Sequence, residues 1–252
     1  MKPLLLSKLF LAALVCAAVV FPSCSKTGLQ PQSSSSLTLE DNSAISNIFR
    51  NDKEMTSFYS DSGNVLKYRP DPTHGQDVYT DFIAGVGSGN QNYVPELPVN
   101  VWEYGGLIIT RSFIGFPKLS LLPDTLEIVS AKLYLFPPKD FLNHPQGNTG
   151  ANECVIQRVT QHGWNEAGLT WDNQPREVSE EGQAIIPATT DQFGYHPVVD
   201  ITALVKKIVS GTVPNYGFRI KLTNEKPLAA VNFASSEAED AWRRPMLEIQ
   251  YK

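Results

Sequence analysis

Short runs of alternating apolar and polar residues, separated by turn-forming residues, limit the fold of this sequence more than any other feature. In residues 131–136, Ala131, Leu133 and Leu135 are apolar and alternate with other side chains. Residues 246–251 (MLEIQY) follow the same two-residue period. In an extended strand, this period places all the apolar side chains on one face. The pattern therefore predicts strands that pack against a core by one side.

One segment has the spacing of a helix instead. Between Asp200, the expected N-cap, and Gly211, the expected end, apolar residues recur every three or four positions. Many strands with a single short helix favour an all-β fold over an α/β fold. We therefore predict a two-sheet antiparallel β-sandwich, jelly-roll-like in form and with one short helix, over residues 64–252.

The composition narrows the classes of protein further. Hydrophobic residues make up 42% of the 252 residues, which is enough to form a core. The formal net charge of −5 provides no basic surface for the phosphates of a nucleic acid. Three cysteines, Cys16, Cys24 and Cys154, are too few for a disulfide scaffold.

Several motifs in residues 68–252 are similar to those of a known domain and occur in the same order. The most specific is W-x-E-x-x-x-T-W-x-x-x-P, which spans residues 164–175. The others are GQDVY (75–79), IVSAKLYL (128–135), VDIT (199–202), NYGF (215–218), FASSE (233–237) and RPML (244–247). Together they make this region resemble the bacterial DNRLRE-type domain.

This resemblance implies a β-sandwich of the cell envelope that is related to carbohydrate-binding modules and has no catalytic activity. It favours a protein that binds a polysaccharide or another glycan without cleaving it. One alternative is a structural or adhesive envelope subunit that contacts other envelope proteins. Another is a polysaccharide hydrolase or lyase. A hydrolase requires two carboxylates at set distances in space, which the sequence does not show.

The first residues have the pattern of a bacterial lipoprotein signal peptide, which we assign to residues 1–23. Lys2 and Lys8 accompany an apolar run over residues 9–21, which is too short to span a bilayer. The pair Ser23-Cys24 resembles a lipobox, in which the cysteine after a small residue is acylated.

We therefore predict lipidation at Cys24 and a flexible tether over residues 24–63. The protein would then be attached to the bacterial outer membrane by its lipid anchor alone. The leaflet that holds it stays open. An ordinary secreted protein that is cleaved nearby is the alternative.

Motifs of enzymes and metal sites are missing from the sequence. The four histidines are far apart, no D-x-D-x-D loop occurs, and Ser88 is not part of a G-x-S-x-G motif. Acidic runs, namely Glu180-Glu181 and Glu237 with Glu239 and Asp240, are interpreted as surface charges. We predict no catalytic residues, no metal site from a local motif and no cofactor, and the sequence leaves open whether distant residues form a Ca²⁺ site.

Aromatic side chains that stack on sugar rings are the first candidates for ligand contacts. Trp102 and Tyr104 alternate onto one side of an extended segment. The alternative for this pair is that it closes one end of the sandwich. Tyr195 lies in a loop with glycine and proline, and Trp242 and Arg243 precede the last predicted strand.

Trp164 and Trp171, within the family-like segment, are interpreted as packing residues. Arg243, together with Arg219 or Lys221 on a polar strand face, has the chemistry to bind an acidic polysaccharide.

Overall fold

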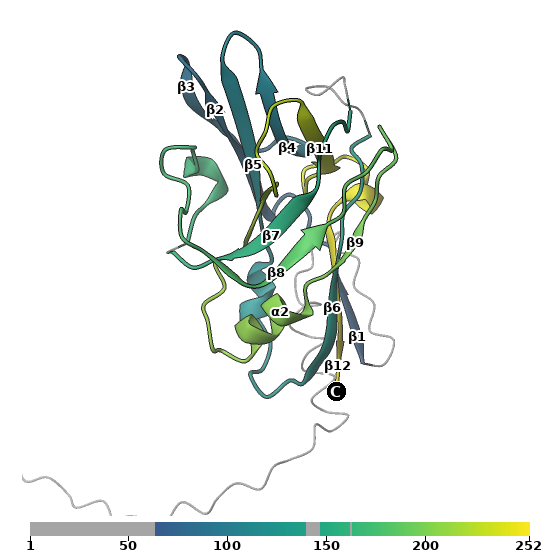
Figure 1. The fold of residues 1–252 in the computed structure, drawn as a ribbon. Coiled ribbons are helices and arrows are strands. Elements are labelled where there is room, and N and C mark those ends of the chain that lie inside the picture. Colours follow the sequence, from purple (N-terminus) through teal and green to yellow (C-terminus); the bar gives the residue numbers. More distant parts are fainter. Residues whose placement is uncertain (1–63, 140–146, 162) are drawn as a thin grey trace, which may run out of the picture. The chain divides into compact units, whose positions relative to one another are not determined.

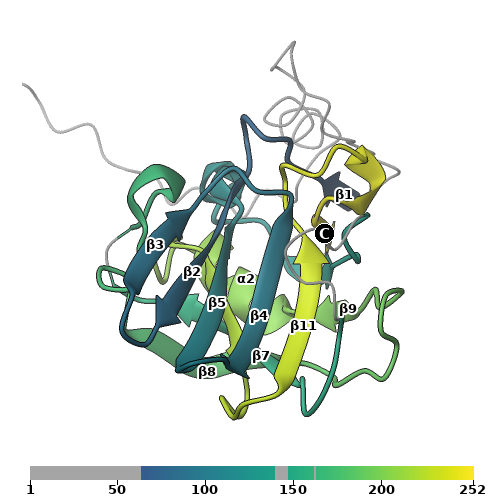
Figure 2. The same ribbon diagram turned by 90° about the horizontal axis from the view of Figure 1, so that it is seen from above.

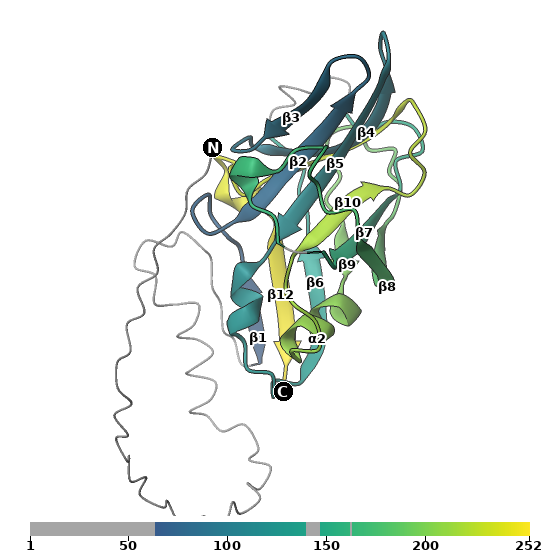
Figure 3. The same ribbon diagram turned by 90° about the vertical axis from the view of Figure 1, so that its left-hand side faces the viewer.

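The computed structural model describes residues 64–139, 147–161 and 163–252. This part of the chain forms two antiparallel sheets and one α-helix, which confirms the predicted all-β sandwich (Figure 1). The smaller sheet has four strands, which lie in the order β1 (Val65–Tyr68), β12 (Met246–Tyr251), β6 (Ile128–Tyr134) and β9 (Val198–Asp200). Figure 3 shows β1, β12 and β6 side by side.

The larger sheet has eight strands and is organised around β5 (Leu107–Gly115). One edge of β5 pairs with β2 (Gln76–Ile83), and the other edge is shared by two strands (Figure 2). On that shared edge, β4 pairs with β5 as far as Thr110, and β10 takes over from Ser112. The remaining bounds are β3 (Gly87–Gln91), β4 (Glu96–Glu103), β7 (Cys154–Val159), β8 (Val178–Ile186), β10 (Phe218–Leu222) and β11 (Ala229–Ala234).

The main core combines the apolar faces of both sheets. In β6, Ala131 and Leu133 are buried whereas Lys132 between them is exposed, as the two-residue period predicts. In β12, Leu247 and Ile249 are likewise buried. Each such side chain contributes about 1.5–3 kcal/mol through its removal from water, so these alternating strands supply much of the force that holds the sheets together.

The α-helix of the described residues, α2 (Thr202–Val209), packs against this core through Leu204 and other apolar residues. It begins one residue later than predicted, with Ile201 rather than Asp200 at the N-cap position, because Asp200 is the last residue of β9. The carboxylate of Asp200 nevertheless accepts a hydrogen bond of 2.9 Å from the backbone N–H of Thr202. Gly211, at φ +67°, follows the helix as expected.

A second, smaller core lies on the outer face of the larger sheet. Trp164 belongs to it and is buried, as predicted, and its indole N–H donates to the carbonyl oxygen of Tyr216 at 2.9 Å. The members of this outer cluster are Val78, Phe113, Val159, Trp164 and Leu169. Short 3₁₀ turns complete the described fold: η1 (Pro117–Leu121), η2 (Glu166–Gly168) and η3 (Ala241–Arg243). The outer cluster and η2 hold the β7–β8 loop against the sheet.

The predicted signal peptide, the lipidated Cys24 and the tether over 24–63 lie outside the described residues. Within the described part of the chain, no helix has both the length and the apolar character needed to cross a membrane.

Candidate functional site

A pocket lies on the outer face of the larger sheet, where β5 changes its pairing partner. Arg219 of β10 is opposite Phe113 of β5, and Phe113 belongs to the outer cluster. Arg111 lies on the same face, because it is two residues from Phe113 along β5. The β7–β8 loop supplies the other lining residues. The pocket, called here the arginine pocket, has a volume of about 320 Å³ and is lined by Arg111, Trp171, Gln174, Arg176 and Arg219.

Arg111 is held between an acidic side chain and an aromatic ring. Its Nε and Nη2 atoms donate to the two carboxylate oxygens of Glu225 at 2.6 and 2.7 Å, which makes a bidentate ion pair. Its Cζ atom lies 4.6 Å from the centre of the Trp171 ring, within the range of a cation–π contact. The ring of Phe82 is 5.7 Å from that of Trp171. The sheet therefore supports Trp171 from two strands.

The charge on Glu225 is retained despite its partial burial. Burial raises the pKa of this carboxyl group, but its hydrogen bonds and ion pair with Arg111 bring the pKa below its ordinary value. Glu225 is therefore ionised at neutral pH and fixes the orientation of Arg111.

Arg219 is the most buried cation of the pocket, with 7% of its surface exposed. Its Nη2 atom donates to Oε1 of Gln157 at 2.9 Å. Its Nε atom is buried and has no hydrogen-bond partner among the described residues. Burial, and then the neighbouring charge of Arg111, lower the pKa of Arg219 to about 10, so the group is charged at neutral pH. A buried guanidinium with an unused donor favours an anionic or strongly accepting ligand.

The arginine pocket thus places three guanidinium groups around one indole ring, in a chain of net charge −5. Guanidinium groups bind carboxylate and sulfate in a bidentate manner, and an aromatic face complements the apolar face of a sugar ring. The described lining residues include no acid, histidine or tyrosine. They therefore offer anion binding without a general acid or base.

A model of carbohydrate-binding module family 96 matches residues 82–251, well over half of the chain. The chain belongs to carbohydrate-binding module family 96. All five residues that line the arginine pocket of this family 96 module lie within the matched region. A search among curated proteins finds no match to the sequence.

The predicted ligand residues Trp102 and Tyr104 lie away from the arginine pocket of the module. Trp102 is near the end of β4, opposite Ile108 of β5, and is half-buried. Tyr104 follows in the β4–β5 turn and is 88% exposed. Only Tyr104 of this pair is fully available to a ligand.

Tyr195, also predicted to bind a ligand, packs against the main core of the module. Its hydroxyl group donates to the carbonyl oxygen of Pro187 at 2.6 Å. The centre of its ring lies 6.3 Å from that of Phe233. These contacts support a packing role for Tyr195.

Trp242 and Arg243 lie on η3, at a different place on the family 96 module. Trp242 is 64% exposed, and the guanidinium carbon of Arg69 is 5.4 Å from its ring centre. Arg243 forms an ion pair of 3.3 Å with Asp240. Arg243 also lines a second pocket, of about 270 Å³, together with Glu237. Of these two predicted residues, Arg243 lines the second pocket, whereas Trp242 does not.

Sequence reasoning missed Arg111 and assigned Trp171 to packing alone. The structure leaves Trp171 half-buried, with part of its surface in the arginine pocket. Arg111 carried a usable signal, because it occupies an outward position of the β-prone run 107–115, two residues before Phe113. Only the pairing of β5 with β10, however, brings Arg111 beside Arg219.

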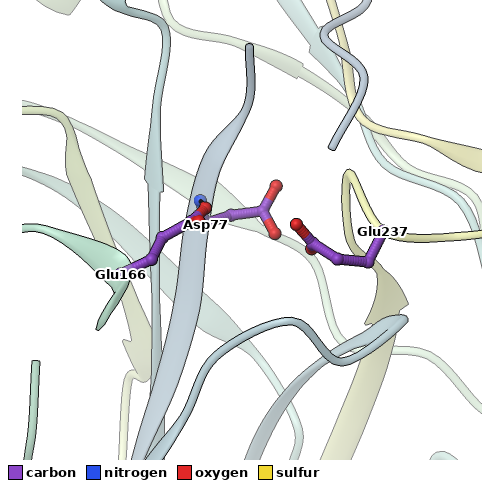
Figure 4. A group of neighbouring side chains, drawn as sticks. All are labelled: Asp77, Glu166 and Glu237. Atoms are coloured by element: carbon purple, nitrogen blue, oxygen red, sulfur yellow. Dashed lines mark hydrogen bonds between the residues drawn. The ribbon is translucent and has the colours of Figure 1, made fainter. Parts of the chain in front are cut away.

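A group of three acidic side chains lies near the start of β2. Asp77 of β2, Glu166 of η2 and Glu237, which follows β11, each place one carboxylate oxygen within 4.8 Å of the others (Figure 4). This carboxylate cluster offers oxygen ligands of the kind that hard metal ions bind. The sequence predicted no metal site, because the three residues belong to no local motif.

Proposed function

We propose that this chain binds an acidic polysaccharide at the arginine pocket and does not cleave it. Membership of carbohydrate-binding module family 96 supports a carbohydrate ligand. The observation that carries the proposal for an acidic ligand is Arg219, which lines the pocket beside Trp171 and has a buried Nε atom without a hydrogen-bond partner among the described residues. A sugar carboxylate or sulfate supplies the missing acceptor, while the indole ring contacts the pyranose.

A binding role without cleavage agrees with the groups around the pocket. Glycoside hydrolysis requires two carboxyl groups on either side of the scissile bond. Glu225, the acid paired with the lining residue Arg111, has both carboxylate oxygens bound to it. A lyase or hydrolase at this pocket therefore lacks a free acid or base among the described residues that line it.

We also propose where the protein lies in the cell and which envelope domains it is related to. The lipobox-like pair Ser23-Cys24 supports a lipid anchor in the bacterial outer membrane. The ordered motifs of residues 68–252 support a relationship to DNRLRE-type envelope domains. A protein anchored in this way would hold a polysaccharide close to the envelope.

The experiment measures binding of the purified full-length protein to a polyuronate and to a neutral glucan of matched length. We expect binding to the polyuronate only, and the affinity should fall as salt increases. Arg219→Gln should weaken binding by about 10–100-fold, because hydrogen bonds to charged groups are worth about 1.5–3 kcal/mol.

Lys206→Gln is the matched control, since it removes one positive charge from an exposed position on α2. It should bind as the unaltered protein does. Equal binding of both polysaccharides, with no effect of Arg219→Gln, would refute the proposal.

A further inference from the structure

Asp77, the most buried member of the carboxylate cluster, has one carboxylate oxygen that receives no hydrogen bond from the described residues. Asp77 is only 2% exposed. Its Oδ2 atom accepts a hydrogen bond of 3.0 Å from the backbone N–H of Ser236. Its Oδ1 atom is buried and has no hydrogen-bond donor among the described residues. A buried carboxylate oxygen without a donor or a cation is strongly unfavourable.

Glu237 presents a second such oxygen to the same space. Its Oε1 atom accepts a hydrogen bond of 3.3 Å from the hydroxyl group of Ser236, whereas Oε2 is buried and has no donor in the described part of the chain. In Figure 4, the carboxyl groups of Asp77 and Glu237 point toward one another. Two carboxylate oxygens that face each other need a proton or a cation between them.

The electrostatics of the cluster lead to the same requirement. Burial raises the pKa of Asp77 well above its ordinary value, and the charges of Glu237 and Glu166 raise it further. Burial also raises the pKa of Glu166 to about 7. Three carboxylates this close can all be ionised only if a cation neutralises them.

The spacing and the donor atoms indicate which cation fits. A Ca²⁺ ion holds oxygen ligands at about 2.3–2.6 Å, so ligands on opposite sides of it are roughly 4.6–5.2 Å apart. The three carboxylate oxygens lie within 4.8 Å of one another. A set of oxygen atoms alone suits Ca²⁺ or Mg²⁺ rather than Zn²⁺. Three ligands from separate segments form an irregular set, which Ca²⁺ tolerates better than Mg²⁺.

The cluster is also reachable from solvent, because Glu237 lines the second pocket. We propose that Asp77, Glu166 and Glu237 bind one Ca²⁺ ion, which ties the start of β2 to η2 and to the segment after β11. Water or backbone oxygens complete the coordination shell. This site is independent of the arginine pocket, so either proposal can fail without the other.

The test begins with the purified full-length protein after treatment with a chelator and its removal. Calorimetric titration with CaCl₂ should show one ion per chain, with a dissociation constant on the order of 10⁻⁴ M or tighter. The melting temperature should rise with the Ca²⁺ concentration, because the ion binds the folded state. Mg²⁺ at equal concentration should produce a smaller rise. No heat of binding, together with equal melting temperatures in chelator and in millimolar Ca²⁺, would show that protons rather than a metal neutralise the cluster.

Single variants distinguish weaker Ca²⁺ binding from a destabilised fold. Asp77→Asn should weaken Ca²⁺ binding by about tenfold or more, because the number of charged ligands sets the affinity. In chelator, its melting temperature should equal or exceed that of the unaltered protein, because repulsion within the cluster is relieved. Glu237→Gln should behave in the same way and serves as a second variant if Asp77→Asn does not fold.

Glu239→Gln is the matched control. Glu239 is exposed and lies two residues from Glu237, outside the cluster. It should keep the full response to Ca²⁺. A full response in both Asp77→Asn and Glu237→Gln would overturn the assignment.

Discussion

The guanidinium group of Arg111 contacts Trp171 and, at the same time, binds both carboxylate oxygens of Glu225. Because the ion pair fixes the position of Arg111, the arginine in turn orients the indole ring at the edge of the arginine pocket. If the arginine pocket binds a polysaccharide as proposed, Trp171 is already ordered before the ligand binds, which lowers the entropic cost of binding.

The two tryptophans of the family-like segment should respond differently to truncation. Trp171→Ala should weaken polysaccharide binding by about 1–3 kcal/mol, by analogy with stacking of bases on aromatic side chains. Trp171→Ala should lower the free energy of unfolding less than Trp164→Ala does, because Trp171 is only half-buried. Trp164→Ala should instead destabilise the fold by about 3–5 kcal/mol, as truncation of a core aromatic residue does. Urea unfolding and calorimetric binding assays measure both effects. Normal binding by Trp171→Ala would remove this residue from the site.

Tyr104 tests whether the β4–β5 turn forms a second sugar platform. The side chain is 88% exposed, so Tyr104→Ala should leave the melting temperature unchanged. If the arginine pocket is the main site, polysaccharide binding should also be unchanged. A stable Tyr104→Ala protein with clearly weaker binding would place a ligand contact at this turn, and Trp102→Ala would then show whether the neighbouring ring takes part.

A glycine before β2 allows the close approach of Ser236. A Cβ atom at Gly75 would lie 2.3 Å from Oγ of Ser236. Gly75→Ala should therefore destabilise the protein by about 1–3 kcal/mol, because this contact can be relieved only by a shift of the chain. Gly163→Ala is the control, since its added methyl group meets nothing closer than 3.7 Å. Equal melting temperatures for the two variants would contradict the packing described at Gly75.

Asp71 should make the stability depend on acid. Burial raises the pKa of Asp71, but hydrogen bonds from His74 and Thr73 more than offset this and lower the pKa from 3.8 to about 2. The facing group is the imidazole ring of His74, whose Nδ1 atom lies 2.7 Å from Oδ1 of Asp71. Since the folded-state pKa is the lower one, the stabilisation is complete above pH about 4 and is lost as the pH falls toward 2. Asp71→Asn should lack this loss in unfolding curves measured across that range, and identical acid profiles would exclude the contribution.

The proposed lipid anchor depends on one residue. Cys24→Ala should move the protein from the membrane fraction to the soluble fraction and abolish the incorporation of labelled fatty acid. Cys154→Ala is the control, because Cys154 is buried within the fold. A Cys24→Ala protein that still sediments with membranes and still carries labelled lipid would disprove this anchor.

The strands could be predicted from the sequence, whereas the sites mostly could not. The alternation of Ala131 and Leu133 with polar neighbours depends only on the local geometry of a strand. The start of the helix near Asp200 and Thr202 is likewise set by neighbouring residues. The pair Arg111 and Arg219 depends on which strands become neighbours, and no local pattern encodes that choice. The carboxylate cluster likewise joins separate segments of the chain, since Asp77 and Glu166 are 89 residues apart.

The exchange of pairing partners along β5 has a consequence for how this module can vary. Arg111 stands between Thr110, which pairs with β4, and Ser112, which pairs with β10. Backbone hydrogen bonds therefore set the position of the pocket, and the side chains that line it do not. Arg176 comes from the covering loop and is exposed, so it can be exchanged without disturbing the sheet. One scaffold can in this way acquire a different glycan preference by substitution at a few loop positions, while the pocket stays where it is.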